Sequence, residues 1–244
     1  EVVYSVIPRP ANLGAVTSSI IGIHPNFENY QLEALQKLGV KWSRVMSPSA
    51  FFRWSRVEPT QGNFIWYDQE VQRASVYGMT ILGTLGTNNY WPTWADNNGL
   101  PNLDYWESFV ENMVNHYKPY VKYWEIWNEP IYNFTSQFYA SMSIRAANAI
   151  HRADPEAKIV GFGGVYDYNW ILSSIGYMGT NWKNYLDYIS THLYPGGEGN
   201  ALAFKTNIID QYNIEVWNTE TGMWDTGFYK GSNSNFITVG EAIW

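Results

Sequence analysis

Residues 124–130 read Trp124-Glu125-Ile126-Trp127-Asn128-Glu129-Pro130, and they mark where a strand ends. The β-branched and aromatic run from Val121 to Trp127 is typical of a buried strand. Proline cannot donate to a sheet ladder and keeps the residue before it out of the helical region, so the strand ends near Asn128 and Glu129. Ligands bind at this carboxyl end in parallel α/β folds. Glu129 is therefore a candidate acid in an apolar cleft of sugar size.

Strand-like and helix-like runs alternate along the whole chain at fairly even intervals. The expected strands are Ser19–His24, Lys41–Met46, Thr80–Thr84, Val121–Asn128, Lys158–Gly163, Tyr188–His192 and Glu215–Thr219. Such alternation implies parallel strands joined by right-handed crossovers. A chain of 244 residues without an internal linker fits one barrel of this kind. We predict a single (β/α)8 TIM-barrel domain, of the α/β class, over residues 1–244.

Three of the expected helices have clear patterns. Apolar positions with a period of about 3.6 residues run from Trp106 to Tyr117, and Asp104 is well placed as the N-cap. A second pattern runs from Phe138 to Ile150. A third runs from Val71 and ends on Gly78, a residue suited to the left-handed position after a helix.

The predicted barrel lacks its eighth strand. After the seventh strand only a polar tract at residues 232–235 and a short helix pattern from Phe236 to Trp244 remain. Seven strands leave unpaired edges on the first and the last strand. We expect a C-terminally truncated barrel whose gap is covered by Glu1–Ile7 or by a second copy of the chain, which would make a homodimer.

Charge and composition exclude several classes of function. The net charge is −7 and Lys and Arg do not cluster, which argues against binding to nucleic acid or to an anionic membrane. The absence of cysteine excludes disulfides, thiol catalysis and thiolate zinc sites. No run of about 18 apolar residues is present to span a membrane. The amino terminus lacks the features of a signal peptide, and we expect a secreted mature form.

Aromatic residues are abundant, with 13 Trp, 19 Tyr and 11 Phe. They could form a tryptophan-rich core, or they could line a cleft against which the CH faces of sugar rings stack. Composition alone does not separate these two interpretations, and we expect both.

Two glutamates occupy equivalent strand ends. Glu129 follows the fourth strand, and Glu220 follows the seventh in the segment Val216–Gly222. In a parallel barrel both project toward the axis at the same rim. Acetal hydrolysis needs such a pair of carboxyl groups, separated by about 5–5.5 Å for retention or about 6.5–9.5 Å for inversion.

Further motifs accompany these glutamates over about residues 19–224. They are Val40–Val45 with its arginine, the Trp…Glu-Pro…Gly…Trp…Asp pattern of residues 54–68, Trp91–Ala95, Ser190–Pro195 and Thr219–Gly222. Together with residues 124–130 they resemble the clan A retaining glycoside hydrolases, most of all glycoside hydrolase family 39 and its neighbours such as families 5 and 10.

The resemblance implies a hydrolase of β-linked oligo- or polysaccharides that needs no cofactor. Glu129 would be the general acid/base and Glu220 the nucleophile. Asn128 would bind the sugar 2-hydroxyl, and Arg44 would keep Glu220 ionised. Among the substrate-binding residues, His192 and Tyr194 match positions that orient the nucleophile and contact sugar.

Other polar and aromatic residues have two interpretations each. Sugar stacking is expected of aromatic residues at strand ends or in loops, namely Trp91, Trp94, Trp217 and Trp224. His24 closes the first strand and fits a sugar contact or a structural hydrogen bond equally well. Glu125 shares strand parity with Glu129, which favours a buried, paired structural charge. Glu58 precedes a proline and is expected to be exposed or to cap a turn.

Other classes of function fit the sequence less well. Only His24 and His192 lie at strand ends, without a His-x-His pair, so we expect no metal. A non-catalytic carbohydrate-binding barrel would keep the aromatic cleft, and truncation could leave an inactive hydrolase. The sugar, the linkage and endo or exo action are left open by the sequence.

Overall fold

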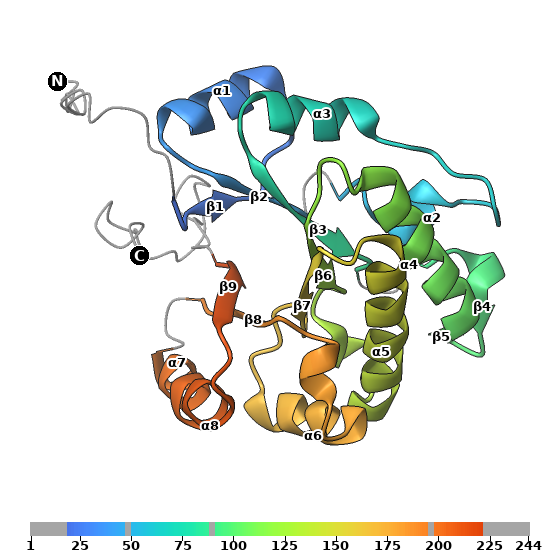
Figure 1. The fold of residues 1–244 in the computed structure, drawn as a ribbon, viewed down its shortest axis with the longest axis vertical. Helices are drawn as coiled ribbons and strands as arrows, with labels where there is room; N and C mark the ends of the chain where they lie inside the picture. Colours follow the sequence, from blue (N-terminus) through green and yellow to red (C-terminus); the bar gives the residue numbers. More distant parts are fainter. Residues whose placement is uncertain (1–18, 47–49, 88–90, 195–197, 222–244) are drawn as a thin grey trace, which may run out of the picture.

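The computed structural model describes residues 19–46, 50–87, 91–194 and 198–221. Seven strands form one sheet in the order β1-β2-β3-β6-β7-β8-β9, and every neighbouring pair is parallel (Figure 1). The strands are β1 (Gly22–Ile23), β2 (Trp42–Val45), β3 (Thr80–Leu85), β6 (Tyr123–Ile126), β7 (Lys158–Gly161), β8 (Tyr188–His192) and β9 (Val216–Glu220). The seven strands predicted from the sequence are confirmed.

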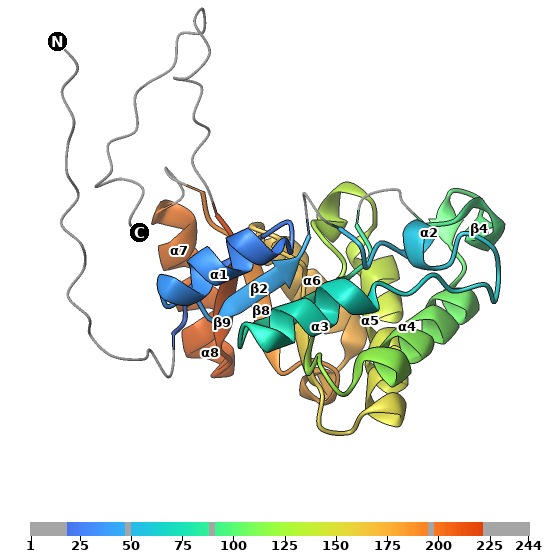
Figure 2. The ribbon, with the colours of Figure 1, turned by 90° about the horizontal axis from the view of Figure 1, so that it is seen from above.

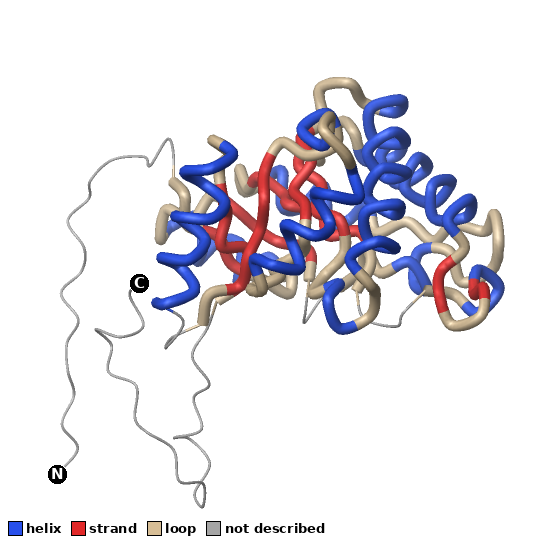
Figure 3. The backbone as a smooth tube through the Cα atoms, turned by 90° about the horizontal axis from the view of Figure 1, so that it is seen from below, coloured by secondary structure: helices blue, strands red, loops and turns tan. Residues whose placement is uncertain are grey.

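Helices surround this sheet, and Figure 3 shows the strands in the interior with helices outside them. The α-helices are α1 (Asn29–Lys37), α2 (Trp54–Val57), α3 (Asp68–Val76), α4 (Leu103–Tyr117), α5 (Ser136–Ala153), α6 (Tyr168–Met178), α7 (Glu198–Phe204) and α8 (Asp210–Tyr212). Shorter turns are η1 (Thr93–Ala95), η2 (Pro130–Tyr132), η3 (Trp182–Asn184) and the π-helical η4 (Lys205–Ile209). A small hairpin, β4 (Asp96–Asn97) and β5 (Leu100–Pro101), stands apart from the sheet. No helix in the described ranges is long and apolar enough to cross a membrane.

Over the described residues the sheet curls into a TIM barrel of seven strands, one fewer than the usual eight. β1 and β9 are its two end strands, and α1 and α3 cover the side that Figure 2 turns toward the viewer. The His24 side chain joins the two ends, because its Nε2 atom lies 3.2 Å from the carbonyl oxygen of Thr219. The expected edge donor Glu1–Ile7 and the helix pattern from Phe236 to Trp244 lie outside the described residues, so a homodimer through the open edge stays a prediction.

The helix ends follow the sequence signals with one correction. Gly39 and Gly78 have φ values of 77° and 69°, as expected for residues that follow a helix. The N-cap of α4 is Asn102, whereas Asp104 was predicted. The Asn102 side chain accepts hydrogen bonds from the backbone N–H groups of Asp104 and Tyr105. Asp104 lies inside the first turn, where its negative charge suits the helix dipole.

Large aromatic side chains fill the core. The fully buried tryptophans are Trp54, Trp106, Trp124 and Trp127. They contact one another and neighbouring rings, for example Trp54 against Phe109 at 5.1 Å between ring centroids. The tryptophan-rich core that the composition suggested is therefore present.

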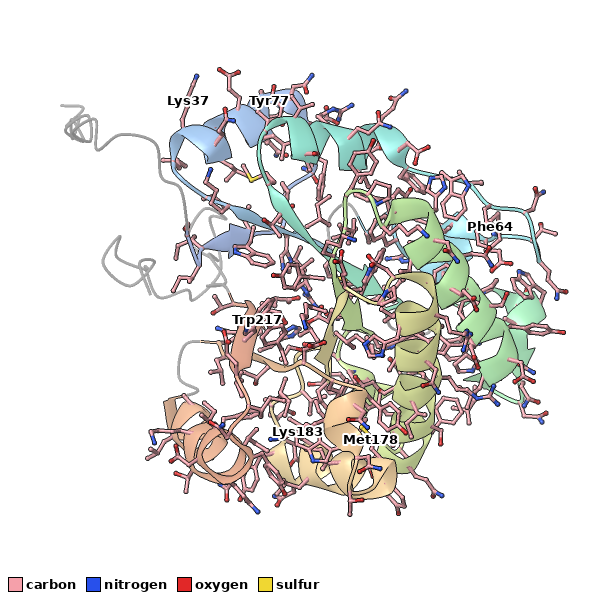
Figure 4. The ribbon with its side chains drawn as sticks, viewed as in Figure 1. Lys37, Phe64, Tyr77, Met178, Lys183 and Trp217 are labelled. Atoms are coloured by element: carbon pink, nitrogen blue, oxygen red, sulfur yellow. The ribbon has the colours of Figure 1, made fainter. Side chains whose placement is uncertain are left out.

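A layer of aromatic rings occupies the barrel interior near the amino-terminal ends of the strands. Trp217 lies 5.3 Å from Trp42, 5.7 Å from Tyr123 and 4.4 Å from Tyr188, measured between ring centroids. The four residues come from the beginnings of β9, β2, β6 and β8, and Figure 4 shows Trp217 on β9. Ligands bind at the opposite ends of such strands.

The prediction that Trp217 stacks on sugar is wrong for this reason. Because alternate residues of a strand share a face, Trp217 and Thr219 point into the barrel together, and Trp217 lies deeper. Trp217→Ala should lower the free energy of unfolding by about 2 kcal/mol, since it removes a partly buried ring from an aromatic layer.

Urea unfolding followed by circular dichroism measures this change. Val76→Ala is the control, because Val76 is 80% exposed on α3 and should leave the midpoint unchanged. A Trp217→Ala midpoint equal to that of the parent would contradict the structural role.

Candidate active site

A strained turn carries Glu129 out of the sheet. β6 ends at Ile126, and both Trp127 (φ 65°) and Glu129 (φ 48°) adopt left-handed conformations that non-glycine residues avoid. The N–H of Glu129 donates to the carbonyl oxygen of Gly163 at 2.7 Å. A Cβ atom on Gly163 would lie 2.2 Å from the carbonyl oxygen of Trp127, so this close approach of the β6 and β7 ends requires glycine. Two strand ends together fix the position of Glu129.

Glu220 is the last residue of β9 and faces a cation and a phenol. Arg44 Nη1 lies 2.8 Å from its Oε2 atom, and the Tyr194 hydroxyl donates to its Oε1 atom at 2.5 Å. Burial acts to raise the pKa of Glu220, but the Tyr194 hydrogen bond and the charges of His192 and Arg44 outweigh it and lower the pKa. Glu220 is therefore held as a carboxylate.

One guanidinium connects the buried polar groups below the rim. Arg44 is 4% exposed and also binds Glu125 Oε2 at 2.6 Å and Asn128 Oδ1 at 2.7 Å. Glu125 is fully buried, and the hydroxyls of Thr84 and Thr219 donate to its two oxygens at 2.9 and 2.7 Å. Burial disfavours the ionised form, yet Arg44 and these partners hold the pKa of Glu125 below its usual value. The interpretation of Glu125 as a paired structural charge is confirmed.

His192 lies between the two glutamates. Its Nδ1 atom is 3.1 Å from Glu129 Oε1, and its Nε2 atom is 4.0 Å from Glu220 Oε2. The ring is buried against Gly164, where an added Cβ would come within 2.0 Å of Nε2. Among the described residues Nε2 has no hydrogen-bond partner. A single imidazole thus contacts one glutamate and faces the other.

The remaining predicted residues have different outcomes. His24 makes the structural contact to Thr219 described above, and burial together with the charge of Arg44 lowers its pKa. Trp91 is partly buried, its Nε1 atom donates to Asp96 at 2.9 Å, and its ring lies 6.1 Å from that of Trp127. Its contact with sugar stays a prediction. Trp224 lies outside the described residues.

Glu58 is buried, so the expectation of an exposed side chain is wrong. It is 5% exposed, and its two oxygens accept hydrogen bonds from Trp54 Nε1 at 3.0 Å and from the N–H of Gly62 at 2.8 Å. The second bond is the expected turn-capping contact.

The sequence did not point to two tyrosines beside Glu129. Tyr132 is 65% exposed and Tyr166 is 45% exposed, and their side chains hydrogen-bond to each other. That bond and partial burial raise the pKa of Tyr132 to about 12, and the charge of Glu129 adds to the rise. The sequence signal that could have identified Tyr132 as a site residue is its position three residues after Glu129. Among the described residues no group of three or more His, Cys, Asp or Glu side chains could hold a metal ion.

Comparisons with known proteins give the fold a family context. No family model matches the chain. It is 29% identical over 182 residues to endo-1,4-beta-xylanase A of Phanerodontia chrysosporium, which covers 67% of this chain and 41% of the relative. The chain therefore spans about two fifths of that xylanase.

Solved structures show the same barrel. A GH10 xylanase of Thermobacillus composti superposes with a TM-score of 0.66 at 15% identity, covering 90% of this chain and 72% of the other. A family 39 glycoside hydrolase from Bacteroides cellulosilyticus gives a TM-score of 0.56 at 19% identity, over 71% and 37% of the two chains. The predicted resemblance to clan A glycoside hydrolases, with family 39 among them, is confirmed.

Tyr194→Phe should raise the pKa of Glu220, because it removes the hydrogen bond that most favours the carboxylate. Titration of the Glu220 carboxyl carbon by NMR measures the shift. Tyr166→Phe is the matched control, since it removes a phenol near Glu129 that has no contact with Glu220 in the described structure. An unchanged pKa in Tyr194→Phe would contradict this assignment.

Proposed function

We propose that this chain carries the active site of a retaining glycoside hydrolase that cleaves β-linked polysaccharides, with xylan as the favoured substrate. The observation that supports this most is the unequal setting of the two glutamates around His192. Glu220 binds Arg44 and Tyr194, whereas Glu129 pairs with His192 alone within the described residues. Unequal surroundings of this kind let two carboxyl groups take different roles in acid–base catalysis.

The first step breaks the bond between the anomeric carbon and the leaving oxygen. A Glu220 oxygen forms the new bond to that carbon, while Glu129 donates its proton to the leaving oxygen. In the second step water attacks the anomeric carbon, Glu129 takes a proton from this water, and the bond to Glu220 breaks. Two displacements at one carbon restore its original configuration.

Asn128 is positioned for the sugar by its own hydrogen bond. Its Oδ1 atom accepts from Arg44, which fixes the amide orientation and leaves the Nδ2 group as a donor. A donor beside both glutamates suits the sugar 2-hydroxyl, a contact that strengthens in the transition state. Tyr132 and Tyr166 stand on the side of Glu129, and we assign them to the leaving group.

The choice of xylan rests on the sequence relatives. Both curated relatives found are endo-1,4-beta-xylanases of Phanerodontia chrysosporium, each 29% identical over the matched part. The exposed phenols of Tyr132 and Tyr166 beside Glu129 suit a neutral sugar.

Replacement of Glu220 by Gln should lower turnover of soluble xylan by at least about a thousandfold, because the nucleophile is lost. Binding of xylan should change by less than about threefold, since this group acts mainly in the transition state. Glu129→Gln should instead spare only the first step with substrates whose leaving group needs no proton, so a dinitrophenyl β-xyloside should give a burst of dinitrophenol followed by slow turnover. The control is Glu33→Gln, which alters only an exposed ion pair on α1.

Proton NMR of the first product gives the stereochemical outcome. Retention releases the β-anomer, and we expect a carboxyl separation near the shorter range of about 5–5.5 Å. Release of the α-anomer would contradict the double displacement. Binding without turnover in the parent chain would indicate a non-catalytic carbohydrate-binding barrel.

A further inference from the structure

A cavity lies outside the barrel, away from the two glutamates. It has a volume of about 170 Å³ and is formed by the loop after α2, by η1 and by the outer face of α4. Figure 4 shows Phe64, one of the residues that line the cavity, at the edge of the molecule near α2 and away from Trp217. The lining residues are Glu58, Gln61, Gly62, Phe64, Trp94, Tyr105, Ser108 and Asn112. The site of Glu129 and Glu220 shares none of them.

Aromatic rings form the apolar part of this cavity and are held in place by other rings. Trp94 packs edge-on against Tyr105 at 5.3 Å and against buried Trp54 at 6.0 Å. Phe64 stacks on Trp66 at 4.9 Å with an angle of 8° between the planes. Rings with fixed faces bind the CH face of a sugar with little loss of side-chain freedom.

The polar part of the cavity offers hydrogen-bond acceptors. Glu58 is 5% exposed, and each oxygen already accepts one bond, from Trp54 or from Gly62. A carboxylate has about four acceptor positions, so it has capacity for hydroxyl donors. The Asn112 Nδ2 group donates to the carbonyl oxygen of Ser108 at 2.8 Å, which leaves its Oδ1 atom as an acceptor. A buried carboxylate also disfavours anionic ligands.

Size and exposure limit the ligand further. A cavity of about 150 Å³ accommodates one benzene-sized ring, so this cavity fits one sugar ring and no more. Gln61, Ser108 and Asn112 are exposed at its mouth, which lets a chain continue on both sides.

We propose that this cavity is a second, non-catalytic carbohydrate site that holds one unit of a neutral polysaccharide. It goes beyond the proposed hydrolysis, because it requires no reaction. Its effect is to keep a long chain on the protein while the site of Glu129 and Glu220 acts elsewhere on it.

Affinity gel electrophoresis in soluble arabinoxylan and in mixed-linkage β-glucan tests the proposal. The variants are Tyr105→Ala and Asn112→Ala, both on the exposed face of α4 and made in a Glu220→Gln background to prevent turnover. Tyr105→Ala should lower the apparent affinity, measured from the retardation, about fivefold for at least one of the two polymers, since it removes a stacking face. In the parent background, hydrolysis of a dinitrophenyl β-xyloside should stay within about twofold.

Matched controls come from the same helix and the turn after it. Tyr120→Ala removes a tyrosine that is 42% exposed, against 36% for Tyr105, and Asn115→Ala removes an exposed amide. Neither residue lines the cavity, so both controls should migrate like the background.

Three outcomes would overturn the proposal. They are equal retardation of the cavity variants and the background in both polymers, an equal loss in Tyr120→Ala, or saturable binding of an arginine-rich peptide at Trp94 without polysaccharide binding. A parent chain that hydrolyses nothing, yet loses affinity in Tyr105→Ala, would contradict the proposed function and leave this site in place.

Discussion

The Arg44 guanidinium inside the barrel is the interaction on which the rest of the structure depends. It joins β2 to the buried Glu125 on β6 and to Glu220 at the end of β9. Loss of one partner of a buried pair costs about 3–5 kcal/mol, because a charge is left without compensation. The same cation lowers the pKa of Glu220 and fixes the Asn128 amide. Arg44 thus both holds the strands together around the buried polar groups and keeps Glu220 ionised.

The two glutamates of the site differ because their surroundings differ. Glu220 ends a regular strand and receives a cation and a phenol. Glu129 lies on a left-handed turn that is held by Gly163, and His192 is the only ion-pair partner of its carboxyl group among the described residues. Backbone strain of this kind persists where surrounding contacts fix it, and it is often found at functional sites. These settings support the proposed assignment of Glu129 as the acid and Glu220 as the nucleophile.

Much of this arrangement could be predicted from sequence, since strand alternation and parity are local properties. Alternation located all seven strands, and parity placed Glu125 inside the barrel. Parity also applies to Trp217, which shares a face with Thr219. The position of Trp217 inside the barrel was missed because Trp217 was treated as a strand-end residue, although the predicted strand Glu215–Thr219 already placed it near the beginning of the strand. The cavity around Glu58 combines residues from three segments that are separated in the sequence. No local sequence pattern predicts that these segments lie together in the fold.

Covalent trapping tests the role of Glu220 most directly. A dinitrophenyl 2-deoxy-2-fluoro-β-xyloside has a good leaving group, and its fluorine slows both steps by destabilising the oxocarbenium-like transition state. Mass spectrometry of the treated chain should show one added fluorosugar, and peptide mapping should place it on Glu220. A label on Glu129, or substrate consumption with no label on any residue, would contradict the assignment of Glu220 as the nucleophile.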